Sequence, residues 1–198
     1  MNKNFIFFSK LSLVLVLFVI LAGSLVRMTG SGMGCPDWPK CFGYLIPPTN
    51  IEKITWKPNQ PYNKGVMILH DNKFFNSKKK FISESSFESI NWIPYTKHDY
   101  TKFDPLNTWF EFVNRLIGAI AGFSTLIMFF LSTYEFKRNK NLTFLSGLVV
   151  LSMGFQAWLG KLVVDSNLSP YKISIHMLMA IVIVCLIIYI IKKADAKC

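Results

Sequence analysis

The residues of this chain that could do chemistry lie in or beside long apolar segments. Glu111, Asn114 and Arg115 stand in the stretch TWFEFVNRLIGAIAG, where spacings of three and four residues place them on one face of a helix. His176 stands in a second apolar stretch, YKISIHMLMAIVIVC. Ionisable groups inside a membrane are costly and usually face the interior of the protein. A carboxylate, an amide, a guanidinium and an imidazole in such segments therefore predict a binding or catalytic site.

Two further residues extend this candidate site. Gln156 lies in the middle of a third apolar segment, and Arg27 ends the first one. An apolar pocket with an imidazole and nearby guanidinium groups suits a haem, because imidazole binds the iron and guanidinium groups bind the propionates. The structural alternatives are an ion pair between Glu111 and Arg115 within one helix, and interhelical hydrogen bonds from His176 and Gln156.

A second group of residues surrounds a pair of cysteines. Cys35 and Cys41 flank the sequence PDWPK, in which Pro36 and Pro39 favour a tight turn. Outside a bacterial plasma membrane this segment would be in an oxidising compartment, where a disulfide forms and persists. We therefore predict a Cys35–Cys41 disulfide that closes a small, rigid loop at the end of the first apolar segment.

Long apolar runs must position these residues. The chain has 198 residues, 52% of them hydrophobic, and a helix needs roughly 20 apolar residues to cross a bilayer. Four runs meet this length and predict transmembrane helices at about 5–26, 107–134, 142–164 and 172–191. The first run has the basic start of a signal peptide, but it is long for one, and we expect a retained helix. The predicted fold is an all-α integral membrane protein, with residues 1–198 as a single four-helix membrane domain and a long external loop at 27–106.

Basic residues beside the apolar segments predict the orientation of the helices. They lie near the N-terminus, between the second and third helices, and after the fourth: Lys3, Lys10, Lys137, Arg138, Lys140, Lys192, Lys193 and Lys197. Because short cytoplasmic loops carry an excess of lysine and arginine, we expect both termini in the cytoplasm and the loop at 27–106 outside. The formal net charge of +11 then reflects membrane topology, and no nucleic-acid partner is expected. Within the polar external loop we allow for a short helix near 76–92.

Four stretches of the sequence together resemble the haem A synthase family. They are GSLVRMTGSGMGCPDWPKCFG after the first helix, WFEFVNRLIGAIAG opening the second, QAWLGKLVV in the third and HMLMA in the fourth. The first is the most specific, because it keeps the order Arg-x-Thr-Gly-Ser-Gly, then Cys, Asp-Trp-Pro and Cys. Cys35 and Cys41 match the external cysteine pair of the family. The resemblance leaves out the polar middle of the external loop.

The resemblance implies an activity, a substrate and an architecture. Members of the family oxidise the C8 methyl group of haem O to a formyl group, which gives haem A for terminal oxidases. They have eight helices in two similar halves, of which the N-terminal half holds the substrate haem and the C-terminal half holds a haem b that relays electrons. This chain resembles the N-terminal half. We therefore expect a haem b-binding partner half or a homo-oligomer in the lipid membrane, with haem O synthase as a further partner.

The resemblance also assigns roles to single residues. Glu111 corresponds to the family's candidate catalytic glutamate, and His176 to the second histidine of this half, which binds the haem iron. The position of the first histidine is Asn114, followed by the matching Arg115, and asparagine is a poor ligand for iron. His98, just before the second helix, is a conceivable substitute for the missing histidine.

The sequence thus favours haem A synthesis in a bacterial plasma membrane, and two other functions stay open. Asn114 and the half-length chain favour a non-catalytic haem-binding or assembly subunit. Cys35 and Cys41 would serve a membrane thiol–quinone oxidoreductase. Their spacing is wider than the usual Cys-x-x-Cys, however, and this function would leave Glu111 and His176 unexplained.

Overall fold

The computed structural model describes residues 3–96, 102–134, 136 and 139–196. The chain divides into two compact units, one formed by Met1–Met28 with Val113–Cys198 and the other by Thr29–Phe112. The first is a helix bundle, which we call the membrane unit. The second contains the long connection after the first helix, which we call the loop unit.

Long helices confirm the predicted integral membrane protein. Within the described residues, four helices are long and apolar enough to cross a membrane: α1 (Lys3–Met28), α2 (Pro105–Thr133), α3 (Lys140–Asp165) and α4 (Pro170–Asp195). Their ends lie within four residues of the predicted positions. A helix such as α1, with 26 residues, is about 39 Å long, which exceeds the roughly 30 Å apolar thickness of a bilayer. Large exposed apolar side chains, such as Phe18, Phe123 and Phe144, form the surface that lipid would cover.

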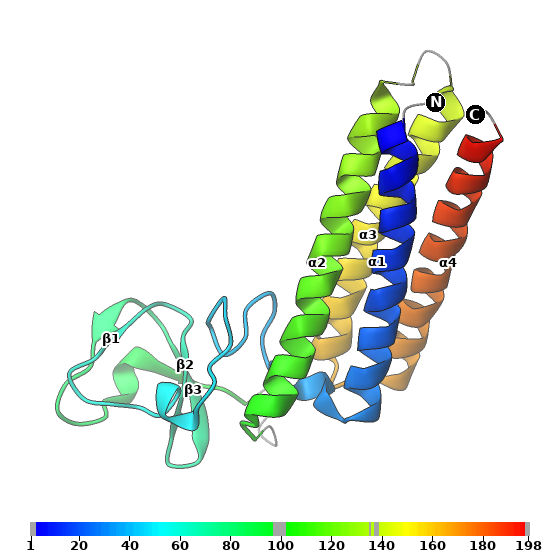
Figure 1. Ribbon diagram of the computed structural model, residues 1–198. Helices are drawn as coiled ribbons and strands as arrows, with labels where there is room; N and C mark the ends of the chain where they lie inside the picture. Colours follow the sequence, from blue (N-terminus) through cyan, green and yellow to red (C-terminus); the bar gives the residue numbers. More distant parts are fainter. Residues whose placement is uncertain (1–2, 97–101, 135, 137–138, 197–198) are drawn as a thin grey trace. The chain divides into compact units, whose positions relative to one another are not determined.

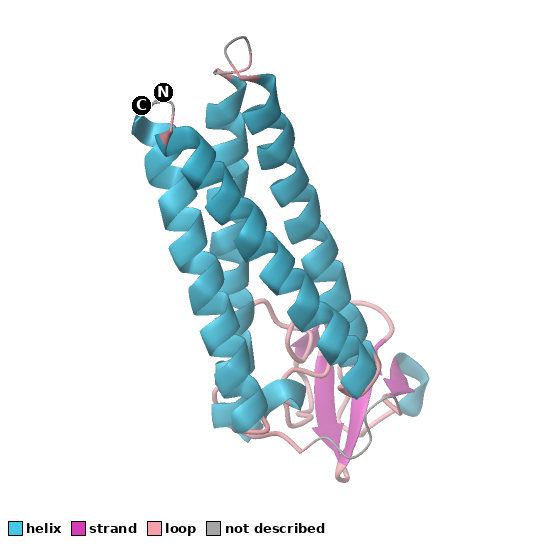
Figure 2. Cartoon of the chain, turned by 90° about the vertical axis from the view of Figure 1, so that its right-hand side faces the viewer, coloured by secondary structure: helices cyan, strands magenta, loops and turns pink. Residues whose placement is uncertain are grey.

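The helices of the membrane unit run side by side and alternate in direction (Figures 1 and 2). α4 packs against both α1 and α3. The start of α1 and the end of α4 lie at the same end of the unit, where Lys10 Nζ is 3.8 Å from Asp195 Oδ2. This arrangement agrees with both termini on one side of a membrane, and the assignment of that side to the cytoplasm stays a prediction.

Apolar side chains from all four helices form the core of the membrane unit. The buried members are Phe5, Val16, Ala121, Met128, Leu142, Val149, Ile183, Ile187, Ile190 and Ala194. Small polar groups buried nearby bond between helices, since Ser12 Oγ lies 2.8 Å from Ser124 Oγ. Thr143 Oγ1 likewise donates to the carbonyl oxygen of Ser132 at 2.8 Å. Because lipid offers such groups no partner, these bonds favour helix packing.

The loop unit consists of short antiparallel strands around buried aromatic side chains. β1 (Pro61–Tyr62) pairs with β4 (Phe81–Ile82), and a second sheet has the order β2 (Met67–His70), β3 (Lys73–Ser77), β5 (Trp92–Pro94). Asp71 and Asn72 join β2 to β3 with φ angles of 47° and 59°, the left-handed conformation that tight hairpins require. Two clusters of buried side chains fill the unit: Tyr62, Val66, Ile68 and Trp92, and then Cys35, Cys41, Phe42, Ile54, Met67 and Phe74.

The structure contradicts the possible short helix near 76–92. This segment holds the end of β3, all of β4, the start of β5 and a three-residue 3₁₀ helix at Ser89–Asn91. Phe81, Ile82 and Trp92 are aromatic or β-branched, and such residues favour strands when they pack against neighbouring strands. Here Phe81 lies opposite Tyr62, and Trp92 opposite Ser77.

Replacing Ile187 with alanine tests the core of the membrane unit. Ile187 is completely buried, whereas Ile188 beside it on α4 is 49% exposed. We expect Ile187→Ala to lower the free energy of unfolding by about 2–5 kcal/mol, because it leaves a cavity, and Ile188→Ala to lower it by clearly less. Thermal unfolding of both variants in one detergent measures the difference. Equal losses would show that Ile187 does not belong to the core.

Candidate functional site

An aspartate cap fixes the start of α2, to which the cysteine loop attaches. Asp104 Oδ1 accepts hydrogen bonds from the backbone N–H groups of Leu106 at 2.9 Å and Asn107 at 3.4 Å. Pro105 takes the first helical position, where no N–H is needed. The sequence DPLN therefore begins the helix at a defined residue and sets the positions of the residues that follow on its first turns.

Gly34 and Cys35 pack closely against the first turn of α2. Thr108 Oγ1 lies 2.9 Å from the carbonyl oxygen of Gly34, and Cys35 Sγ lies 3.7 Å from the carbonyl oxygen of Thr108. Ser31 Oγ adds a hydrogen bond to Asn107 Oδ1 at 2.7 Å. A Cβ atom on Gly34 would clash with the Asn107 carbonyl group and lie 2.7 Å from the Thr108 nitrogen. Only glycine allows this close approach of the loop to the helix.

Glu111 faces the same loop, one turn further along α2. Its side chain is 4% exposed, and Oε2 accepts a hydrogen bond from the backbone N–H of Cys35 at 2.8 Å. A buried carboxylate is costly unless it is hydrogen-bonded, and this N–H group supplies part of what it needs. The carboxylate thus connects α2 to the cysteine loop, in addition to any role in catalysis.

Cys35 and Cys41 form the predicted disulfide, with an S–S distance of 2.05 Å. The two residues are 0% and 1% exposed. The carboxylate of Asp37 closes the turn between them and the following residues, because it accepts hydrogen bonds from the N–H groups of Phe42 at 2.6 Å and Gly43 at 2.8 Å. Phe42 has a φ of 54°, a strained value for phenylalanine. The disulfide and Asp37 together hold this strained turn in place.

In the membrane unit, Gln156 and His176 come together from α3 and α4. Gln156 Nε2 donates to the carbonyl oxygen of His176 at 3.0 Å and lies 3.4 Å from the ring atom His176 Nε2. Gly160, one turn along α3, lets the ring approach, since a Cβ atom there would lie 3.4 Å from His176 Cε1. The interhelical hydrogen bonds that the sequence allowed for each residue as a structural alternative thus take the form of a contact between the two.

Arg27 and Asn114 belong to the same unit. Arg27 Nη1 lies 3.5 Å from Met177 Sδ, and no carboxylate of the described residues pairs with this guanidinium. Asn114 faces α1 at Gly23, where a Cβ atom would lie 3.8 Å from Asn114 Oδ1. Arg115 follows on α2 with a partly buried side chain. Arg27 thus contacts α4 at Met177, the residue that follows His176, the candidate iron ligand.

Three candidate residues leave buried polar atoms without a partner among the described residues: Asn114 Oδ1, Gln156 Oε1 and His176 Nδ1. Each unpaired buried atom costs about 1–3 kcal/mol, so a bound group with polar atoms or a metal ion would stabilise this region. Imidazole nitrogen is a haem ligand, and the guanidinium of Arg27 suits a propionate. The residues of the membrane unit therefore fit a haem. No group of three or more His, Cys, Asp or Glu side chains in the described ranges could hold a bare metal ion.

The single binding or catalytic site that the sequence predicts for Glu111, Asn114 and His176 stays a prediction, because Glu111 belongs to the loop unit and the other two residues to the membrane unit. His98, the conceivable second ligand, lies outside the described residues.

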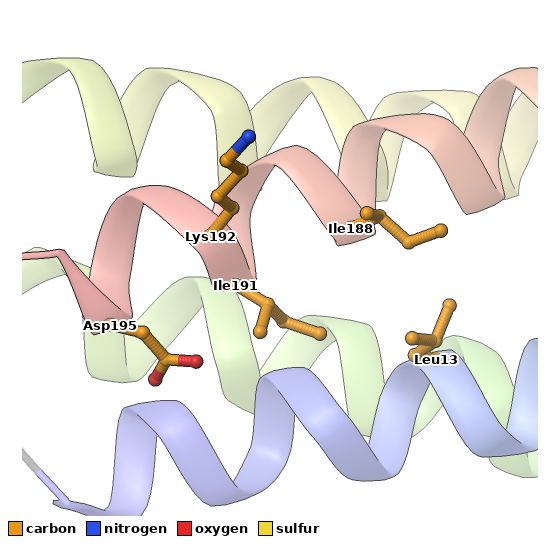
Figure 3. Close-up of a pocket in the computed structure, with 5 residues that line it drawn as sticks. All are labelled: Leu13, Ile188, Ile191, Lys192 and Asp195. Carbon is orange, nitrogen blue, oxygen red and sulfur yellow. The ribbon is translucent and has the colours of Figure 1, made fainter.

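A pocket of about 330 Å³ lies between α1 and α4 and is lined by Leu13, Ile188, Ile191, Lys192 and Asp195 (Figure 3). On α4, Ile188 follows His176 by 12 residues, which is about 18 Å along the helix. This pocket is therefore distinct from the candidate haem site. A second pocket, of about 400 Å³, lies in the loop unit and is lined by Thr49, Asn50, Ile51, Glu52, Phe103 and Pro105.

Sequence reasoning missed Thr108, Gly34 and Asp37 as residues that position the cysteine loop. Two features of the sequence point to Thr108 and Asp37. Thr108 precedes Glu111 by three residues and so shares its helical face, and an aspartate within a turn commonly accepts from nearby backbone N–H groups. No local signal pairs Gly34 with Thr108, because they are 74 residues apart.

Comparison with protein families gives a match over nearly the whole chain. Residues 7–197 match the COX15-CtaA family, described as "Cytochrome oxidase assembly protein". The chain belongs to this family. His176, Glu111 and the disulfide loop all lie within the matched residues.

Curated relatives of this family member carry the name Heme A synthase. One from Shewanella oneidensis is 27% identical over 169 residues, which are 85% of this chain and 39% of the relative. One from Pelagibacter ubique is 26% identical over 212 residues, which cover 99% of this chain and 55% of the relative. The predicted family resemblance is confirmed, and the chain spans between about two-fifths and just over half the length of these relatives. No solved structure matches the chain.

Two substitutions at Thr108 test how the cysteine loop is held. Thr108→Val removes the hydroxyl group, whose proton is shared between the carbonyl oxygens of Gly34 at 2.9 Å and Asp104 at 2.7 Å, so we expect it to destabilise the loop unit by about 1–3 kcal/mol. Thr108→Ser keeps the hydroxyl group and serves as the control. Limited proteolysis of the loop unit under non-reducing conditions compares the two. Identical cleavage rates would contradict the role of this contact.

Proposed function

We propose that the chain is a haem A synthase or its substrate-binding half, in a bacterial plasma membrane with the loop unit outside and both termini in the cytoplasm. The observation that carries this proposal is His176, a histidine in a membrane helix of a cytochrome oxidase assembly protein with an unpaired, buried ring nitrogen. The relatives named Heme A synthase support it. Haem O is then the substrate and haem A the product.

The membrane unit supplies the groups that would hold haem O. His176 would bind the iron, with its ring positioned by the amide of Gln156. Arg27, which contacts the weak acceptor sulfur of Met177, would be available for a propionate. Asn114 and Arg115 would contact the porphyrin from α2, and the asparagine makes a single protein ligand to the iron the simplest arrangement. Bound haem O supplies the iron and the methyl group that is oxidised.

Glu111 would act on the methyl group. A buried carboxylate can accept a proton from a carbon that is being oxidised, or stabilise positive charge that develops there. The hydrogen bond from the Cys35 N–H would hold the carboxylate in one position, so the cysteine loop would act as its support. The electrons and the new oxygen atom must be exchanged with groups outside this chain, for which we propose a haem b-binding partner half or a second copy. Haem O synthase would supply the substrate.

Two observations favour a second function, that of a haem-binding assembly subunit without catalysis. Asn114 stands where the family resemblance places a histidine, and Glu111 already has a structural role toward Cys35. The thiol–quinone alternative is disfavoured by burial. Disulfide exchange needs access to a sulfur atom, and both cysteines are almost completely buried.

His176→Ala should remove most of the bound haem and leave the bundle folded. His70→Ala is the control, because His70 lies in the loop unit and stacks on Phe87 with ring centroids 4.0 Å apart. The Soret absorbance per mole of purified protein measures the loss, and circular dichroism checks the fold. If His176→Ala keeps full haem occupancy and an unchanged Soret band, His176 is not the ligand.

Glu111→Gln should leave haem bound but stop its oxidation. Glutamine keeps a side-chain oxygen that can accept from the Cys35 N–H, so the support of the loop survives while charge and basicity are lost. In the full assembly, including any haem b-binding partner, the pigment extracted from this variant should be haem O in place of haem A. Formation of haem A at the normal rate would rule out a catalytic Glu111 and favour the assembly subunit.

A further inference from the structure

We infer that the groove between α1 and α4, near the start of α1 and the end of α4, binds an anionic phospholipid of the membrane. Its cavity of about 330 Å³ is at the lower end of the volumes of small-molecule sites and would hold part of an acyl chain. Figure 3 shows Leu13 on α1 opposite Ile188 and Ile191 on α4, with Asp195 near one end of this apolar set. The groove thus has an apolar floor and a charged end.

The apolar part of the groove lies on membrane-spanning helices, so its surroundings in a membrane are lipid. Leu13, Ile188 and Ile191 offer a water molecule no hydrogen bond, so water would be held poorly between them. In a membrane, such helices are surrounded by the acyl chains of lipids. An acyl chain of one lipid lying along these three side chains would cover the apolar surface of this open groove.

The charges at the end of the groove favour a negative headgroup. Four lysines lie near this end on the described parts of α1 and α4, against a single aspartate: Lys3, Lys10, Lys192, Lys193 and Asp195. No carboxylate of the described residues pairs with Lys192, which lines the groove. In Figure 3 its ammonium group points away from Leu13, and its flexible stem could bring the charge to a phosphate at the mouth.

Lys10 is held only weakly by the aspartate. Its Nζ lies 3.8 Å from Asp195 Oδ2, and the two side chains are 58% and 49% exposed. Exposed pairs of this kind contribute little, so a lipid phosphate could take the place of the carboxylate. Asp195 therefore acts as a competitor of the headgroup, and its removal should strengthen binding.

Native mass spectrometry of the full chain tests the site with phosphatidylglycerol and phosphatidylcholine of identical acyl chains. The wild type should retain phosphatidylglycerol in preference. Lys192→Gln should weaken its retention about fivefold, as expected for one lysine near an anionic headgroup, and Asp195→Asn should strengthen it by a similar factor. Lys172→Gln, at the other end of α4, is the matched control and should change nothing.

Two further arms complete the test. Ile188→Trp should fill the groove and reduce retention of the lipid while the Soret band and the helix content stay unchanged. Glycerol phosphate, a headgroup without chains, should fail to displace the lipid. The inference is overturned by equal retention of the two lipids, by no gain in Asp195→Asn, by an equal loss in Lys172→Gln, or by displacement with glycerol phosphate alone.

Discussion

Burying polar atoms among apolar side chains costs free energy unless each atom finds a partner, and this cost organises both units of the molecule. In the loop unit side chains and backbone pair with each other. The Cys35 N–H donates to Glu111, and the Thr108 hydroxyl lies within hydrogen-bond distance of the carbonyl oxygens of Gly34 and Asp104. In the membrane unit small hydroxyl groups pair between helices, as Ser12 does with Ser124. Among the described residues, unpaired buried atoms remain on Asn76, Asn139 and Ser146 and on three candidate haem residues, Asn114, Gln156 and His176. The last three include an imidazole, and a bound group with polar atoms would give them partners.

The cysteine loop supports the buried carboxylate of Glu111. Its disulfide is buried and so is poorly placed to exchange with other thiols. What it does in the structure is hold the backbone of Cys35 against α2, at the point where Glu111 accepts its hydrogen bond. A small rigid loop beside a membrane helix therefore has a physical role, which is to hold a backbone N–H against a buried carboxylate.

The helices and the disulfide could be predicted from the sequence because they depend on local properties. A membrane helix is predicted by the length of an apolar run and by its few charged residues. A disulfide-closed loop is predicted by two cysteines on either side of a short turn. The strands of the loop unit could not be predicted in the same way, since their pairs, such as Phe75 with Pro94, join distant residues. The docking of Gly34 on Thr108 has the same cause. For the site, the sequence allowed an interhelical hydrogen bond from Gln156 and one from His176 but could not name their partners, because these residues lie on different helices. A single site that joins Glu111 to the haem residues stays a prediction.

The proposed substrate of the membrane unit is haem O. Its presence is tested by extraction and chromatography of the pigment bound to the purified chain, produced in cells that make haem O. We expect haem O, or haem A where an electron-accepting partner is present, and we expect the amount of pigment bound per protein to fall when His176 is replaced. Haem b as the sole pigment, or protein that is folded and colourless in those cells, would contradict this proposal.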